Sequence, residues 1–210
     1  MSTPIVGVLM GEGTGQAVDS DRELWERLRS ADQVALTELF HRYSDAVYNF
    51  AFRRTSSWSL AEDIVQATFT ALWRRAGEGR IDVLALDSAR PVLLTIARYE
   101  CANVTRSGRR LTALRQRLGA IGGSTTTPDH SALAAEKVDD ERAMSELRRA
   151  LAKVPADQRE VIELVAWSGC SMAEAAQVLG VPEGTVKSRL ARARRRLTGL
   201  IDLDTTEGLR

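Results

Sequence analysis

Apolar residues recur at steps of three and four along most of this chain, and this spacing limits the possible folds more than any other feature. The clearest run lies within residues 33–55, where the apolar positions are Leu36, Leu39, Phe40, Tyr43, Val47, Phe50 and Ala51. Such spacing places apolar side chains on one face of an α-helix. Alternating β-branched runs bounded by turn residues are missing, and the aromatic content of 5% is low for a sheet protein. The sequence therefore predicts an all-α fold.

The N-terminal half is predicted to form one small bundle of four helices. The expected helices begin at Asp21 and then cover about 33–55, 59–76 and 91–107. We expect Ser59 to be the N-cap of the third helix, because Glu62 three residues later completes a capping box. Gly77-Glu78-Gly79 ends this helix, and residues 80–90 form a loop. Pro91 suits the first position of the fourth helix.

A stretch rich in Gly, Ser and Thr separates this bundle from a second helical unit. Residues 119–130 have the composition of a linker, and helical periodicity resumes near Asp139 and continues to about Thr198. The sequence thus predicts two small helical domains joined by a flexible linker. The expected segments are a disordered N-terminus (1–18), a first domain (19–110), the linker (111–138), a second domain (139–201) and a tail (202–210).

Charge is distributed unevenly although the formal net charge is only +1. Basic residues gather at 106–117 and 187–196, and acidic residues gather at 136–146 and 157–163. A nearly neutral total therefore conceals local basic surfaces, which are the kind of surface that nucleic acids attract.

The two cysteines, Cys101 and Cys170, lie far apart within apolar helical patterns, so we expect buried free thiols. With no CxxC motif and only two histidines, a zinc site is not expected, and no cofactor is indicated. No segment approaches the roughly 20 apolar residues of a membrane span, and residues 1–16 do not have the pattern of a signal peptide. These features favour a reducing cytoplasm as the location.

A helix-turn-helix is the most specific structural motif in the sequence. Ser171 and Glu174 form a predicted capping box at the start of a short amphipathic helix. Gly180 suits the left-handed position at the end of that helix, and Pro182 suits the start of the next one. A capped helix, a tight turn and a second helix are the elements of a DNA-binding helix-turn-helix.

The second helix of this motif has one apolar and one cationic face. Val186, Leu190, Ala193 and Leu197 follow steps of four, three and four and form an apolar stripe, whereas Lys187, Ser188, Ala191, Arg192 and Arg195 lie opposite it. Lys and Arg donate hydrogen bonds to guanine edges or phosphates. The alternative is a solvated basic face on a structural helix, but the capped helix and glycine turn that come before it favour recognition of the major groove.

Longer motifs around this helix resemble region 4 of extracytoplasmic-function (ECF) sigma factors, members of the sigma-70 family. Residues 147–164 read Leu-x3-Leu-x2-Val-Pro-x3-Arg-x-Val-Ile-x-Leu, and residues 184–190 read Gly-Thr-Val-Lys-Ser-Arg-Leu. The N-terminal half is similar to region 2 of the same family. The matching segments are Leu39-Phe40-x-Arg42-Tyr43, Ala61-Glu62-Asp63-Ile64-Val65-Gln66-x2-Phe69 and Leu93-Leu94-Thr95-Ile96-Ala97-Arg98.

The resemblance implies roles for particular residues in transcription initiation. The residues implied to contact core RNA polymerase at its β′ clamp are Glu62, Asp63 and Gln66. Those implied to approach the −10 element are Arg98, Asn103, Arg106, Arg109 and Arg110. Those implied to read the −35 element or bind nearby phosphates are Lys187, Ser188, Arg189, Ala191, Arg192 and Arg195.

The resemblance also implies the partners: the β′ clamp and β flap of core polymerase, and promoter DNA. Many members of the family are held inactive by an anti-sigma protein, which makes such a protein a candidate partner. A stand-alone helix-turn-helix regulator is the main alternative function. An enzyme is not expected, because the sequence contains no nucleophile–base pairing, phosphate loop or metal-ligand cluster.

Overall fold

The computed structural model describes residues 19–117 and 132–207, with side chains for 19–107 and 138–198. All regular elements in these ranges are helices, which confirms the predicted all-α fold. They are α1 (Asp21–Arg29), α2 (Gln33–Thr55), α3 (Trp58–Gly77), α4 (Arg90–Arg117), α5 (Ala132–Leu151), α6 (Ala156–Ile162), the π-helical segment η1 (Glu163–Trp167), α7 (Met172–Leu179) and α8 (Glu183–Glu207). The predicted disordered N-terminus and residues 118–131 of the predicted linker lie outside the described residues.

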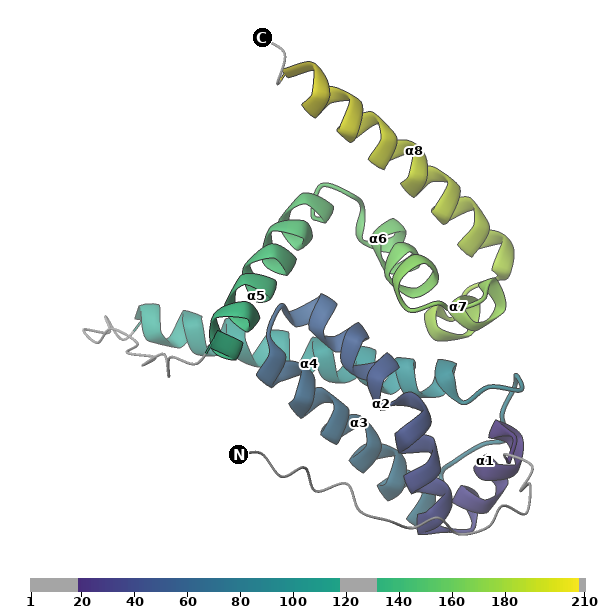
Figure 1. Ribbon diagram of the computed structural model, residues 1–210. Coiled ribbons are helices and arrows are strands. Elements are labelled where there is room, and N and C mark those ends of the chain that lie inside the picture. The colour runs from purple at the N-terminus through teal and green to yellow at the C-terminus, as the bar shows by residue number, and fades with distance from the viewer. Residues whose placement is uncertain (1–18, 118–131, 208–210) are drawn as a thin grey trace, which may run out of the picture.

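Helices α1 to α4 form the first bundle, and α6 to α8 form a smaller unit that lies against it (Figure 1). Helices α2, α3 and α4 pack against one another, and α1 covers one end of α2. Large apolar side chains such as Trp25, Phe50 and Leu93 are at most 2% exposed in this bundle. Burial of this size contributes about 1.5–3 kcal/mol per large side chain before the entropy cost of folding is subtracted. The predicted bundle is therefore present with its core on the predicted apolar faces, except that Phe40 of the predicted α2 face is 39% exposed.

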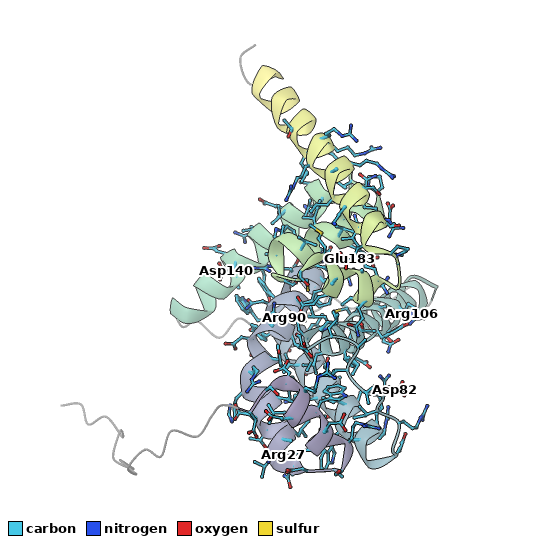
Figure 2. The ribbon with its side chains drawn as sticks, turned by 90° about the vertical axis from the view of Figure 1, so that its right-hand side faces the viewer. Arg27, Asp82, Arg90, Arg106, Asp140 and Glu183 are labelled. Carbon is cyan, nitrogen blue, oxygen red and sulfur yellow. The ribbon has the colours of Figure 1, made fainter. Side chains whose placement is uncertain are left out.

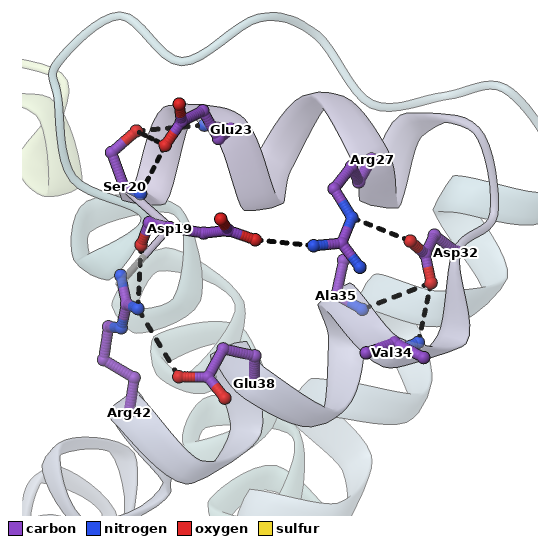
Figure 3. Close-up of polar contacts among 9 residues, drawn as sticks. All are labelled: Asp19, Ser20, Glu23, Arg27, Asp32, Val34, Ala35, Glu38 and Arg42. Carbon is purple, nitrogen blue, oxygen red and sulfur yellow. Dashed lines mark hydrogen bonds and ion pairs between the residues drawn. The ribbon is translucent and has the colours of Figure 1, made fainter. Parts of the chain in front are cut away.

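Hydrogen bonds at the N-termini fix where α1 and α2 begin (Figure 3). Ser20 and Glu23 form a capping box at the start of α1. Asp32 caps α2 by accepting hydrogen bonds from two backbone N–H groups, and Arg27 pairs with Asp32 at 2.8 Å and with Asp19 at 2.6 Å. The Ser20 and Asp32 caps satisfy backbone donors that have no partner inside the helix.

One buried carboxylate connects α1, α2 and the loop before α4. Asp21 is 7% exposed, and it accepts a hydrogen bond from Arg42 at 2.6 Å and from the backbone N–H of Ala89 at 2.7 Å. The hydroxyl of Tyr43 also donates to Asp21. Burial raises the pKa of Tyr43 to about 12, so this hydroxyl keeps its proton at neutral pH. Three donors thus offset the cost of burying one charge.

The start of α3 differs from the sequence prediction. The N-cap is Ser57, not Ser59: Ser57 has an extended backbone and its hydroxyl accepts from the backbone N–H of Leu60. Trp58 is already helical and stacks on Phe52 of α2, with ring centroids 4.0 Å apart. The stacking of Trp58 accompanies an earlier helix start, a tertiary contact that the local Ser59 pattern could not reveal.

Three helices extend further than predicted. Helix α4 continues to Arg117 rather than ending near 107, α5 begins at Ala132 rather than near 139, and α8 continues to Glu207. The added segments of α4 and α5 are rich in Arg, Leu and Ala, which have high helix propensity. Within the described residues, no helix is long and apolar enough to span a membrane.

Candidate nucleic-acid interface

The helix-turn-helix forms as its sequence predicts. The Ser171 hydroxyl accepts from the backbone N–H of Glu174 at 3.1 Å, and the Glu174 carboxylate accepts from the backbone N–H of Ser171 at 2.8 Å. Gly180 ends α7 with φ of +65°, a conformation that costs glycine little. Helix α8 then begins at Glu183, one residue after Pro182. The turn is therefore fixed by local interactions on both sides.

The apolar stripe of α8 is buried and the opposite face is open. Val186, Leu190 and Ala193 are at most 4% exposed, and Leu197 packs against the same core. The exposed residues on the other sides are Lys187, Ala191, Arg192, Arg194, Arg195 and Arg196. Figure 2 shows nitrogen-tipped side chains projecting from α8 into solvent. The domain holds this helix by one face and presents a cationic face to solvent, as a major-groove reader requires.

Two of the residues assigned to this face by resemblance are engaged within the domain. The Ser188 hydroxyl donates to the carbonyl of Thr185 at 3.0 Å and accepts from Arg192 at 3.3 Å. Arg189 is half-buried and pairs with Asp157 of α6 at 3.2 Å. Arg189 therefore joins α8 to α6 in this structure, whereas Lys187 and Arg192 remain exposed.

Helix α3 presents an exposed polar patch. Glu62, Asp63 and Gln66 are exposed, while Ile64 and Val65 between them face the bundle core. The three polar residues thus lie together on the outer side of α3, where a basic partner helix could reach them.

The predicted −10 residues lie along α4, but they are not equally free. Asn103 and Arg106 are exposed and bond to each other at 2.8 Å. Arg98 is half-buried, and its guanidinium binds the carboxylate of Glu160 at 3.0 and 3.1 Å. Arg109 and Arg110 belong to α4, but their side chains lie outside the described residues.

A direct contact between the two helical units was not predicted from the sequence. Helix α4 packs against α7, and Arg54 of α2 pairs with Glu160 at 3.3 Å and with Glu163 at 3.1 Å. Burial raises the pKa of Glu163, although the nearby Arg54 opposes that shift. In the sequence, residues 157–163 form an acidic cluster with no signal that identifies its partners.

The π-helical segment η1 is a second part of this contact. Arg53 donates to the carbonyl of Trp167, and its guanidinium lies 5.8 Å from the centroid of the Trp167 ring. Arg90 donates to the carbonyl of Gly169 at 3.0 Å. Backbone carbonyls at and just after η1 thus accept hydrogen bonds from arginines of the first bundle. Such turns of π-helix often accompany functional sites.

Both cysteines are free and buried, as predicted. Burial raises the pKa of the Cys101 and Cys170 thiols to about 11 each. No group of three or more His, Cys, Asp or Glu side chains that could hold a metal occurs in the described part of the chain.

Comparison with known proteins identifies the family. The sequence matches Sigma-70 region 2 over residues 39–111 and Sigma-70, region 4 over residues 144–197. It is 32% identical to the ECF RNA polymerase sigma factor SigL of Mycobacterium tuberculosis over 175 residues, which cover 80% of this chain and 89% of SigL. The chain belongs to the ECF sigma factors. It is therefore an alternative sigma factor of RNA polymerase, a transcription initiation factor.

Other relatives agree over most of the length of this ECF sigma factor. SigM of Mycobacterium tuberculosis is 29% identical over 201 residues, which cover 94% of this chain and 93% of SigM. Among solved structures, CnrH in complex with the cytosolic domain of CnrY gives a TM-score of 0.61 at 26% identity, covering 89% of this chain and 99% of that one. RpoE in complex with the anti-sigma factor NepR from Bartonella quintana gives a TM-score of 0.52 at 28% identity. The match covers 80% of this chain and 97% of that one.

Proposed function

We propose that this ECF sigma factor binds core RNA polymerase in the cytoplasm and directs it, without catalytic activity of its own, to promoters with −10 and −35 elements. The first domain (19–110) corresponds to region 2 and the second (139–201) to region 4. The observation that carries the proposal is the geometry of α8, whose buried stripe seats the helix while its exposed face carries Lys187, Arg192 and Arg195.

In this proposal α8 enters the major groove at the −35 element. Lys187 and Arg192 donate to base edges, Ser188 bonds at the same face, and Ala191 allows close approach. Arg195 binds phosphate, and Arg189 does so if it exchanges Asp157 for DNA. The exposure of Lys187 and Arg192 supports their role in this proposal, because direct readout requires side chains free to reach the bases.

The other surfaces are assigned to the −10 element and to core polymerase. The residues proposed for the −10 element are Arg98, Asn103, Arg106, Arg109 and Arg110, all on α4. Glu62, Asp63 and Gln66 bind the β′ clamp, and region 4 binds the β flap. The solved structure of RpoE with the anti-sigma factor NepR supports an anti-sigma protein as a further partner.

Promoter binding in this proposal requires the two domains to separate. The −10 and −35 elements lie about 25 base pairs apart, or roughly 85 Å along B-form DNA. Helices α4 and α7 have Cα atoms within 8 Å of each other. We therefore infer that the contact between the domains opens when both elements are bound.

Transcription by purified holoenzyme tests the assignment of α8. The template is a promoter mapped by run-off transcription of the source genome with the same holoenzyme. Lys187→Ala with Arg192→Ala should lower −35-dependent transcription at least about 30-fold, because two base contacts at about 1–3 kcal/mol each contribute at least about 2 kcal/mol together. Arg149→Ala with Lys153→Ala removes the same charge from exposed positions of the same domain and should have little effect. Normal transcription by the α8 variant, with unchanged core binding, would contradict the assignment.

A further inference from the structure

A cavity lies between the two domains, where α4 faces the end of α5 and the start of α6. Its volume is about 740 Å³, within the range of about 300–1,000 Å³ that is usual for small-molecule sites. Arg54, Arg98 and Arg106 line it from α2 and α4, Arg148 lines it from α5, which contacts α2, and Arg159 lines it from α6. The cavity is therefore built by both domains.

The charge of this cavity is strongly unbalanced. Five arginines and two glutamates line it, which leaves an excess of three positive charges. The glutamates are already paired: Glu160 binds Arg54 and Arg98, and Glu163 binds Arg54. The remaining cations have no carboxylate partner within 4.0 Å among the described side chains, and they are Arg106, Arg148 and Arg159.

These three arginines keep donors available for a ligand. Arg148 bonds to the hydroxyl of Ser56 at 3.3 Å, Arg159 to the carbonyl of Leu151 at 3.2 Å, and Arg106 to α4 and Asn103. Each guanidinium has five N–H groups, so most of them remain unused. Partial burial lowers the pKa of Arg148, and the positive charges of Arg159 and Arg54 act in the same direction. An anion in the cavity would relieve this repulsion.

We propose that this cavity binds a small phosphate-rich anion of the di- or triphosphate class. Guanidinium groups bind phosphate oxygens in pairs of parallel hydrogen bonds, which favours arginine-lined sites for such ligands. A triphosphate carries enough negative charge to balance the excess, and the volume admits a nucleotide as well as an inorganic phosphate chain. Because its ligands come from α4 and α5 on one side and from Arg159 of α6 on the other, the anion bridges the first bundle and the α6–α8 unit and stabilises their contact.

Titration calorimetry on the full chain at low salt tests this site, with sodium tripolyphosphate as the probe. We expect saturable binding of one anion per chain. Arg106→Gln on α4 and Arg148→Gln on α5 should each weaken binding about tenfold, because each removes a charge-assisted hydrogen bond to the anion. Arg149→Gln, the adjacent residue of α5, does not line the cavity and should bind as the parent protein does. Arg159→Gln provides a second test from the α6 side.

Each outcome distinguishes one explanation. Absence of saturable binding, or equal loss in Arg149→Gln, would overturn the site. If Arg106→Gln and Arg148→Gln weakened binding and Arg159→Gln did not, or the reverse, the anion would not bridge the two units. In a parallel titration, ATP binding more tightly than tripolyphosphate identifies a nucleotide, and equal affinity identifies the phosphate chain as the recognised group. Because neither polymerase nor DNA is present, failure of this test would leave the promoter function untouched.

Discussion

The carboxylate of Glu160 accepts two hydrogen bonds from the guanidinium of Arg98, at 3.0 Å from Nε to Oε1 and 3.1 Å from Nη2 to Oε2. This pair joins α6 of region 4 to α4 of region 2. The two side chains are 24% and 32% exposed, so solvent only partly screens their attraction. A residue proposed to approach the −10 element is thus occupied by an acidic residue of the other domain. Promoter binding through Arg98 requires this carboxylate to be exchanged for a phosphate.

Glu160→Gln should weaken the contact between the domains. The substitution removes the charge that pairs with both Arg54 and Arg98, and we expect the closed arrangement to lose about 1–2 kcal/mol. Small-angle X-ray scattering of the free protein should show a larger radius of gyration. Glu146→Gln, at an exposed position of α5, is the matched control. Identical scattering from the Glu160 variant and the parent protein would contradict the role of this pair.

Glu62→Lys with Gln66→Ala should reduce binding to core polymerase. The change reverses one charge and removes one amide on the exposed side of α3, so a basic partner helix would meet repulsion. We expect at least a tenfold loss, measured by co-purification and by fluorescence anisotropy with core enzyme. Asp45→Lys with Asn49→Ala makes the same pair of changes at exposed positions of α2, and it should bind normally. If the α3 variant bound core polymerase as tightly as the α2 variant and the parent protein, α3 would not be part of the core interface.

Asp21→Asn should destabilise the first domain. The carboxylate is buried and accepts from Arg42, Tyr43 and the N–H of Ala89, and an amide oxygen cannot replace all three interactions. We expect the free energy of unfolding to fall by about 2–4 kcal/mol. Urea titration followed by tryptophan fluorescence measures it, because Trp25 is buried one turn further along α1. Asp45→Asn, at an exposed site, should change the midpoint little; a similar small change for Asp21→Asn would refute the claim.

The buried thiols predict a loss of stability at alkaline pH. The pKa of Cys101 and of Cys170 rises from 9.0 to about 11 on folding because burial disfavours the thiolate. The folded chain therefore holds these protons more tightly than the unfolded chain, so this stability is intact below pH 9 and is lost between pH 9 and 11. Near pH 10.5 the loss is about 2 kcal/mol per thiol.

Urea unfolding at pH 8 and near pH 10.5 measures this effect. Cys101→Ala with Cys170→Ala should have a smaller stability difference between the two pH values than the parent protein. For each single variant, the stability difference between the two pH values should lie between that of the parent protein and that of the double variant. An unchanged pH dependence in the double variant would show that other groups, such as Tyr43, account for the alkaline loss.

Much of the local structure could be read from the amino-acid order. The bounds of α2, the capping box at Ser171 and the left-handed Gly180 all agree with prediction. The candidate cationic face of α8 was also predicted, because Val186, Leu190 and Ala193 repeat at helical spacing. Each of these features depends on interactions between residues no more than a few positions apart, or on a repeat along one helix.

Other features depended on contacts between distant parts of the chain. Ser57 rather than Ser59 caps α3, at a helix start where Trp58 stacks on Phe52. Arg98 and Glu160 are 62 positions apart, and the pairing of Glu160 and Glu163 with arginines of α2 and α4 left no periodic signal. Helical spacing shows which face of a helix is polar, but it does not show which other helix packs against that face. That choice comes from packing and charge balance between assembled domains, and only the tertiary structure contains it.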